Sequence, residues 1–268
     1  MSQTTPWELY DQLIAGVPEG ITVTDYCLGT NWSYMTAVRD DQVFCGVAYT
    51  ASGGAKRTIK ANMRGWDLRD VAQLAKSWCF EEASLGVAAL NAWYNRSELL
   101  TPLGMEYDEP VELPDGSFKK LDAFDSFAPE IAAKGDARVT VVGHFPRIER
   151  VGEYSQLTVL ERSCRDALDT PDPACEYVLP STDYAFITGV TFINKTATRL
   201  LELCRNAGAK TILVGPSVVM SEKVFEWGAT SLSGSIVKDP EEVAFCCKNG
   251  AGKLFGKGLV TVSVNMPK

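Results

Sequence analysis

The second half of this 268-residue chain alternates short apolar runs with helix-like segments, and this alternation restricts the fold more than any other feature. The runs are nearly continuously apolar, which is typical of parallel strands buried on both faces. They cover residues 137–143, 156–161, 184–189, 210–215 and 229–237. Between the third and the fourth run, residues 195–208 carry one apolar stripe and end at Gly208, as an amphipathic helix does. Repeated strand–helix–strand units predict a right-handed, mostly parallel sheet, which is a Rossmann-like α/β fold.

The first hundred residues follow a different pattern. A short amphipathic helix is expected at residues 6–15. Three β-type runs follow it, at residues 21–28, 33–38 and 43–50. Turn residues separate these runs, which indicates an antiparallel meander. Asp67 then caps one helix, and residues 83–95 form a second helix that is apolar on nearly all sides. We therefore predict a small α+β domain of three strands and two helices before the Rossmann-like domain.

The connection between the two domains is expected at residues 98–120, where prolines are frequent and periodic apolar positions are few. This segment contains Pro102, Pro110 and the turn Pro114-Asp115-Gly116. We divide the chain accordingly into a capping domain at residues 1–105 and a Rossmann-like domain at residues 106–268.

The charge of the chain argues against two kinds of partner. The formal net charge is -8, and no run of Lys and Arg is longer than a pair. Binding to nucleic acid or to an anionic membrane requires a basic patch, so neither partner is expected. The first residues carry acids where a secretory signal carries bases, and no apolar run approaches the roughly 18 residues of a membrane span. We expect a cytoplasmic protein, and the sequence leaves open whether it forms a homo-oligomer.

Eight cysteines are scattered through apolar surroundings without a CxxC pair, so most are expected to be buried thiols rather than metal ligands. The adjacent Cys246 and Cys247 would point to different sides of a helix, which is a poor geometry for one tetrahedral ion. Cys164 and Cys175 differ from the others because they lie in the acidic segment 163–177. They are the candidate metal ligands of this sequence.

Glycine and polar residues recur at the ends of five successive strands of the predicted parallel sheet. Ligands of such sheets bind outside the carboxyl ends of the strands. Glycine lets backbone N–H groups approach a ligand, and Ser and Thr hydroxyls bind oxygen-rich groups. We predict that these residues bind a small-molecule or anionic ligand. The alternative is that Gly and Ser are present only because they form tight turns between strands and helices. They are Gly143, Glu161, Thr188, Gly189, Thr191, Gly215, Pro216, Ser217, Ser233 and Gly234.

Two titratable residues, His144 and Glu161, lie at these strand ends. His144 is the only histidine in the chain. It could act as a general acid and base, and the alternative is that it forms a structural hydrogen bond. Glu161 follows Gly143 by eighteen positions, near the spacing at which dinucleotide folds place the acid that binds ribose. The loop sequence GHFPRI lacks the G-x-G-x-x-G fingerprint, so close packing against a pyrophosphate has no sequence support. A solvated charge at the end of a strand is the alternative for Glu161.

Two further groups of polar residues accompany the strand ends. Asn194 or Thr196 can cap the helix after the third strand, and Lys195 could reach a bound anion. Asn91 and Asn95 lie four positions apart on an otherwise apolar helix, so they share one face, and buried amides need hydrogen-bond partners. They either line the cleft between the domains or form a structural network.

Several of these motifs, taken together, resemble a prokaryotic family associated with heavy-metal chelation. The resemblance rests on T-G-x-T-x-x-N-x-T at residues 188–196, V-G-P-S at 214–217, S-G-x-I-V at 233–237 and A-A-x-N-A at 88–92. It covers nearly the whole chain. It implies a capping domain like the N-terminal domain of enolases, a Rossmann-like domain and an active site between the two. It does not imply enolase chemistry, because no matching acidic triad is present and a fold does not fix a function.

Three functional hypotheses follow. The first is a small-molecule enzyme or ligand-binding protein with its site in the interdomain cleft, connected with heavy metals because it binds, makes or modifies a metal-chelating metabolite. The second is direct metal binding or delivery without catalysis, through thiols such as Cys164 and Cys175. The third is an enzyme that depends on a dinucleotide or on S-adenosylmethionine, with Glu161 at the ribose. The sequence leaves the substrate, the cofactor and the presence of catalysis open.

Overall fold

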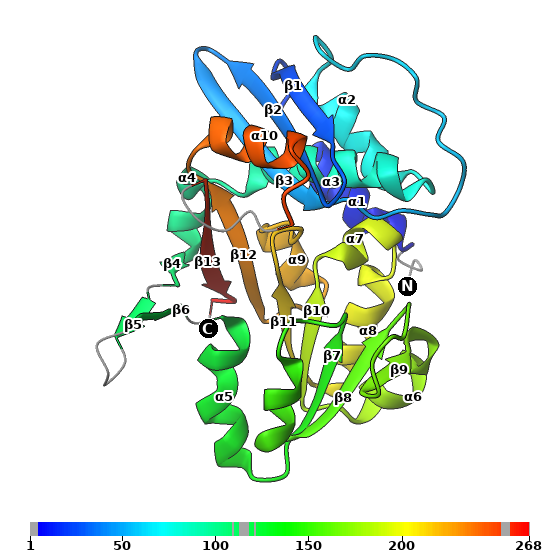
Figure 1. Ribbon diagram of the computed structural model, residues 1–268, viewed down its shortest axis with the longest axis vertical. Coiled ribbons are helices and arrows are strands. Elements are labelled where there is room, and N and C mark those ends of the chain that lie inside the picture. The colour runs from blue at the N-terminus through cyan, green and yellow to red at the C-terminus, as the bar shows by residue number, and fades with distance from the viewer. Residues whose placement is uncertain (1–4, 109, 113–117, 121, 253–257, 268) are drawn as a thin grey trace.

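Two sheets of different size make up the molecule. The structure is a computed structural model that describes residues 5–108, 110–112, 118–120, 122–252 and 258–267. A three-stranded antiparallel sheet lies at one end, and an eight-stranded mixed sheet forms the larger part (Figure 1). The long helix α3 (Phe80–Tyr94) contacts β2 and β3 of the small sheet and α7 beside the large one. The predicted fold class, a small α+β unit followed by a Rossmann-like α/β unit, is confirmed.

The N-terminal unit forms the elements that its turn and capping residues predict. Its strands are β1 (Thr22–Leu28), β2 (Trp32–Arg39) and β3 (Gln42–Tyr49), in the antiparallel order β1-β2-β3. Its remaining elements are α1 (Trp7–Ala15), α2 (Leu68–Ala72) and the 3-10 turn η1 (Gln73–Lys76). Asp40 and Asp41 both have positive φ, as a two-residue hairpin turn requires. The carboxylate of Asp67 caps α2 by accepting a hydrogen bond from the backbone N–H of Arg69.

The large sheet has the order β4-β13-β12-β11-β10-β7-β8-β9. Its strands are β4 (Glu106–Tyr107), β7 (Arg138–Val142), β8 (Gln156–Glu161), β9 (Asp169–Pro171), β10 (Tyr184–Thr188), β11 (Lys210–Val214), β12 (Ser231–Val237) and β13 (Leu259–Asn265). The strands from β7 to β12 are parallel, and they follow the Rossmann order 3-2-1-4-5-6 when numbered along the chain. The order reverses between β7 and β10. β13 and β4 extend the sheet in antiparallel orientation.

Helices cover both faces of the large sheet, which explains why its strands read as continuous apolar runs. One face packs against α5 (Ala123–Lys134) and the 3-10 segment η3 (Ile148–Glu153). The other face packs against η5 (Leu179–Ser181), α6 (Cys175–Val178), α7 (Val190–Asn194), α8 (Ala197–Ala207) and α9 (Glu222–Glu226). Phe186 of β10 is fully buried, 4.7 Å from the ring of Phe124 between ring centres. Burial of such a side chain contributes about 2 to 3 kcal/mol.

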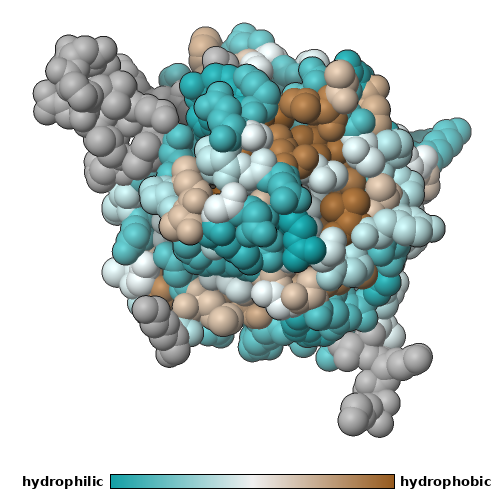
Figure 2. Space-filling view, turned by 90° about the horizontal axis from the view of Figure 1, so that it is seen from below, coloured by the Kyte–Doolittle hydropathy of each residue, from teal (hydrophilic) through white to brown (hydrophobic). Residues whose placement is uncertain are grey.

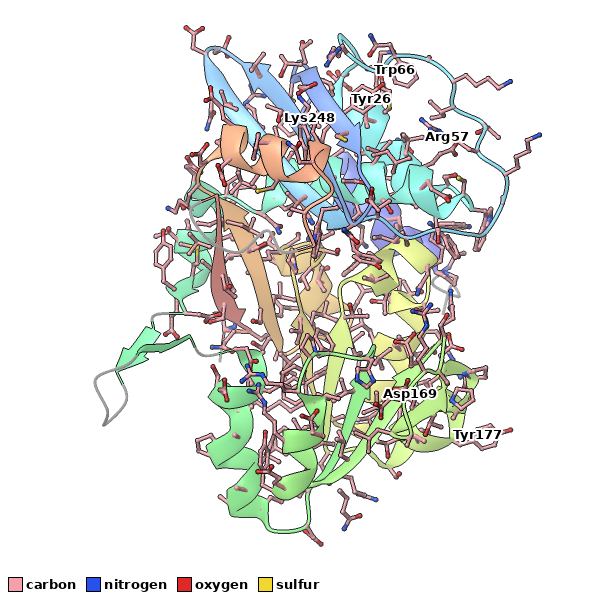
Figure 3. All side chains as sticks on the ribbon, viewed as in Figure 1. Tyr26, Arg57, Trp66, Asp169, Tyr177 and Lys248 are labelled. Atoms are coloured by element: carbon pink, nitrogen blue, oxygen red, sulfur yellow. The ribbon has the colours of Figure 1, made fainter. Side chains whose placement is uncertain are left out.

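The two units share one hydrophobic core, and the C-terminal helix joins them a second time. α10 (Pro240–Lys248) returns to the small sheet and packs on β1 and β2 (Figure 1). There Lys248 Nζ lies 2.7 Å from a carboxylate oxygen of Asp25 (Figure 3 labels Lys248). Buried residues of α1, α3, β10 and β12 belong to the same cluster. The division of the chain at residues 105 and 106 stays a prediction.

The segment between the two units contains several short elements. They are α4 (Ser97–Leu100), η2 (Thr101–Leu103), β4 and the hairpin of β5 (Pro110–Glu112) and β6 (Phe118–Lys120), which projects from the body in Figure 1. The predicted turn Pro114-Asp115-Gly116 lies outside the described residues. Figure 2 shows the end opposite the small sheet, where hydrophilic residues surround a limited hydrophobic patch. In the described part of the chain, no helix has the length and apolarity needed to cross a membrane.

Candidate functional site

A cavity of about 830 Å³ lies at the point where the strand order of the large sheet reverses. Ligands of Rossmann-type sheets bind at this place. The N-terminal unit contributes one wall, with residues 49–52 and Phe80. The large sheet and the elements around it contribute the other walls. The lining residues at the ends of β7 and β8 are 142–144 and 160–163, and those around β9 are Arg165, Asp166, Asp169, Asp172 and Cys175. The lining residues from the end of β10 onward are Thr188, Val190, Thr191, Asn194, Thr196, Arg199 and Leu200.

His144 forms a hydrogen bond with a buried carboxylate in this cavity. Its Nδ1 lies 2.6 Å from Oδ1 of Asp169, whose side chain is 1% exposed. The other oxygen of Asp169 accepts hydrogen bonds from the backbone N–H groups of Arg165 and Asp166, each at 2.9 Å. Figure 3 labels Asp169 beside the ends of the parallel strands. Because Nδ1 is engaged, Nε2 of His144 is the ring nitrogen that remains for a ligand.

This contact shifts the pKa of both partners. The backbone N–H of Arg165 and the imidazole of His144 lower the pKa of Asp169 to about 2. The hydrogen bond with Asp169 raises the pKa of His144. Asp169 is therefore ionised at neutral pH, and the fraction of imidazolium at His144 is larger than for a free histidine.

Glu161 holds the loops after β7 and β8 together. Its Oε2 accepts a hydrogen bond from the backbone N–H of His144, and its Oε1 accepts one from Ser163, each at 3.0 Å. Gly143 precedes this contact with a φ of 98°, a conformation that residues with a side chain rarely adopt. The glycine thus allows the sharp bend that brings His144 beside both Glu161 and Asp169.

Arginines and carboxylates alternate around the mouth of the cavity. Arg162 Nε lies 2.9 Å from Asp172, and Arg199 pairs with Glu176 at 2.6 Å. Within the described ranges, Arg165 has no carboxylate partner. The cavity therefore offers both cationic and anionic groups to a ligand.

The structure does not place the other predicted rim residues in the cavity, because α3 and β3 cover the ends of β11 and β12. Ser217 accepts a hydrogen bond from the backbone N–H of Tyr49 at 2.8 Å. Gly189 lies so close to the next loop that an added Cβ would be 2.3 Å from N of Val218. The remaining predicted rim residues outside the cavity lining are Gly215, Pro216, Ser233 and Gly234.

Asn91 and Asn95 belong to this covered region and form the structural network that was one of their two predicted roles. Nδ2 of Asn91 donates to the carbonyl oxygens of Val47 and Pro216, at 2.8 and 3.2 Å. Asn95 donates to the carbonyl oxygens of Val218 and Ser235 and accepts a hydrogen bond from the N–H of Met220. Asn91 was predicted to bind a ligand, but it is not among the residues that line the cavity. Its amide instead connects β3 of the N-terminal unit with the loop after β11.

Two sequence families match the chain, at residues 10–94 and 125–264, and both carry the description "Putative heavy-metal chelation". The chain belongs to this heavy-metal chelation family. The resemblance seen in the sequence motifs is thereby confirmed.

Solved structures and a curated relative agree with this membership. A protein of unknown function from Desulfitobacterium hafniense, of the DUF364 family, is 32% identical, and the match covers 97% of this chain and 98% of that one with a TM-score of 0.81. A second protein of unknown function from the same family, from Pyrococcus horikoshii, is 18% identical, with a TM-score of 0.74 and coverage of 96% and 98%. An uncharacterised protein of Methanocaldococcus jannaschii is 26% identical over 92% of this chain and 90% of its own length.

The two candidate metal ligands of this family member lie in different surroundings. Cys175 lines the cavity, and burial raises the pKa of its thiol, which favours the protonated form that binds metals poorly. Cys164 is exposed, and its Sγ donates to the carbonyl oxygen of Glu161 at 3.4 Å. Over the described residues, no three His, Cys, Asp or Glu side chains gather in a way that could hold a metal ion.

Lys195 is not among the residues that line the cavity, and its Nζ lies 6.0 Å from the ring centre of Phe80, which does line it. It has a φ of 69° at the end of α7, and its Nζ donates to the carbonyl oxygen of Ile193 at 2.6 Å. Burial lowers the pKa of this amine to about 8. The neighbouring Asn194 accepts hydrogen bonds from both N and Oγ1 of Thr196, and both of these residues line the cavity.

Sequence reasoning missed Asp169, and it also missed Arg165, Asp166, Asp172 and Arg199 of the cavity lining. Asp169 lies in the acidic segment 163–177, which drew attention only for its cysteines. β9 has three residues, too few for a recognisable strand pattern, and it is β9 that brings Asp169 to the end of β7. The wall from the N-terminal unit, residues 49–52 and Phe80, was missed as well, because its position depends on how α3 docks on the large sheet.

Proposed function

We propose that this member of the heavy-metal chelation family is an enzyme that acts on a small molecule in the cavity, with His144 and Asp169 as its acid–base pair. The observation that carries the proposal is the 2.6 Å contact between His144 Nδ1 and the buried carboxylate of Asp169 at the switch point of the sheet. An ionised carboxylate on Nδ1 fixes the imidazole tautomer and orientation, as catalytic histidines require.

The pKa shifts support a role in proton transfer. The ionised Asp169 keeps a proton on Nδ1 of His144. Nε2 can then accept a proton from a substrate or return one to it. The hydrogen bond with Asp169 raises the pKa of His144, so the imidazolium that forms when Nε2 accepts a proton is stabilised.

The connection with heavy metals would lie in the ligand rather than in the protein's own thiols. Arg165 at the rim can bind a carboxylate of a metal-chelating metabolite, and Glu161 can bind its hydroxyl or ammonium groups. The protein would then bind, make or modify such a metabolite.

Turnover of a metabolite extract tests this proposal. The wild-type chain, His144→Gln and Glu149→Gln are each incubated with a cell metabolite extract, and mass spectrometry follows every compound. Glu149 is an exposed residue of η3 close to His144 in the sequence and outside the cavity lining, so it serves as the matched control. We expect compounds that the wild type and Glu149→Gln consume to persist with His144→Gln. Equal consumption by His144→Gln, or no consumption by the wild type, would contradict the proposal.

A further inference from the structure

The carboxylate of Glu161 is fixed at the cavity wall and has unused acceptor positions. Each of its oxygens accepts one backbone hydrogen bond, from His144 or Ser163, at 3.0 Å. In the part of the chain that the structure describes, Glu161 has no salt bridge with a cation. A carboxylate offers about four acceptor positions, so roughly one remains on each oxygen. Two neighbouring hydroxyl groups of a ligand match this arrangement.

The loop after β7 is not built to hold a diphosphate. In sheets of this strand order, a diphosphate binds to backbone N–H groups at the start of the α-helix that follows the first strand. Here the N–H of His144 in that loop is already bonded to Glu161. The element that follows is η3, a six-residue 3-10 helix. Asp169, which is ionised at neutral pH, lies beside the same loop and would repel a phosphate.

The wall from the N-terminal unit can cover a planar, partly apolar group. Tyr49 and Phe80 are the aromatic residues among those that line this wall. Val142, Leu160 and Leu200 add apolar surface on the side of the large sheet. Aromatic rings bind the faces of nucleic-acid bases by stacking, with little dependence on the base. The volume of about 830 Å³ lies in the range of sites that enclose a whole small molecule.

We propose that the cavity binds a ribonucleoside without a diphosphate, whose ribose 2′- and 3′-hydroxyls donate to the carboxylate of Glu161. This inference rests on the proposed function in that it assigns a ligand class to the same cavity. It also revises the dinucleotide hypothesis, because the backbone N–H of His144 is already bonded to Glu161 and the element after β7 is a 3-10 helix rather than the α-helix that binds a pyrophosphate.

Calorimetric titration of the full chain with adenosine, guanosine, cytidine and uridine tests this inference. We expect at least one of them to bind, and its 2′-deoxy and 3′-deoxy analogues to bind about tenfold more weakly or worse, because each loses a hydrogen bond to a charged acceptor. The corresponding 5′-diphosphate should bind no more tightly than the nucleoside. Binding of none of the four, equal binding of the deoxy analogues, or tighter binding of the diphosphate would overturn the inference.

A variant separates the role of Glu161 from general damage to the fold. Glu161→Gln should weaken binding of the ribonucleoside about tenfold, yet leave binding of the 2′,3′-dideoxy analogue nearly unchanged, whereas Glu149→Gln should alter neither. Equal losses for both ligands would overturn the assignment of Glu161. Failure of all nucleosides together with His144-dependent turnover of an extract would remove this inference and leave the proposed function standing. Nucleoside binding without such turnover would keep the inference and remove the proposed acid–base reaction.

Discussion

The ends of β7, β8 and β10 border an open cavity, whereas the ends of β11 and β12 lie beneath α3 and β3. Both regions belong to the carboxyl edge of one parallel sheet, and both are rich in Gly, Ser and Thr. In the open region, titratable side chains such as His144, Glu161 and Asp169 line the cavity. In the closed region, amides of Asn91 and Asn95 donate to the backbone carbonyls of Pro216 and Val218 in the loop after β11.

This difference shows which residues shape the loops and which can bind a ligand. Glycines and hydroxyls shape the tight loops of both regions, so they do not by themselves mark a ligand site. Titratable side chains that line a cavity distinguish the open region. We therefore expect the closed region to serve stability and the open region to serve the ligand.

Asn95→Ala should have the largest effect, because it removes three buried hydrogen bonds of the closed region at once. Two carbonyl oxygens and one N–H group would lose their partner, and we expect the free energy of unfolding to fall by about 3 kcal/mol or more. Urea denaturation measures this change. The control is Asn249→Ala, an exposed asparagine at the end of α10, which should cost much less. Similar losses for the two variants would show that the closed region is not a stabilising interface.

Ser217→Ala tests the same comparison with matched serines. Ser217 is 3% exposed and accepts a hydrogen bond from the N–H of Tyr49, so we expect a loss of about 1 to 2 kcal/mol. Ser163→Ala in the open region removes an exposed hydroxyl and should change stability by no more than about 0.5 kcal/mol. Thermal unfolding of both variants checks this order. A larger loss for Ser163→Ala would reverse the roles assigned to the two regions.

Replacement of both candidate metal-binding cysteines should have the smallest effect. We expect Cys164→Ser combined with Cys175→Ser to leave zinc and nickel retention by the purified protein unchanged, because these thiols do not form part of a metal-holding cluster in the described residues. Equilibrium dialysis followed by metal analysis makes the measurement. Stoichiometric metal in the wild type that disappears in the double variant would instead support direct metal binding.

The local elements could be predicted from the sequence because each depends on neighbours in the chain. Asp67 caps its helix, and the apolar run that begins at Tyr184 is the buried strand β10. The open and closed regions could not be told apart, because that distinction depends on where α3 docks, which is a matter of long-range packing. The partner of His144 was hidden for a similar reason. Asp169 is 25 positions away and approaches only through the pairing of β8 with β9.

The pH dependence of stability should report the pair of His144 and Asp169. The raised pKa of His144 stabilises the fold below the ordinary value of about 6.5, and this contribution is lost as the pH rises through the raised pKa. The lowered pKa of Asp169 stabilises the fold above about pH 3.9, and this contribution is lost as the pH falls toward about 2. The free energy of unfolding of the wild type should therefore exceed that of Asp169→Asn by the largest amount between about pH 4 and 6.5. Urea denaturation across the pH range can measure this difference.

The most direct test is the NMR titration of His144, whose signals need no assignment because it is the only histidine in the chain. We expect its pKa to lie above the ordinary value of about 6.5 in the wild type and to fall in Asp169→Asn. Ser217→Ala, in the closed region, should leave that pKa unchanged. A histidine that titrates at its ordinary value and does not respond to Asp169→Asn would contradict the assignment of an acid–base pair to the open region.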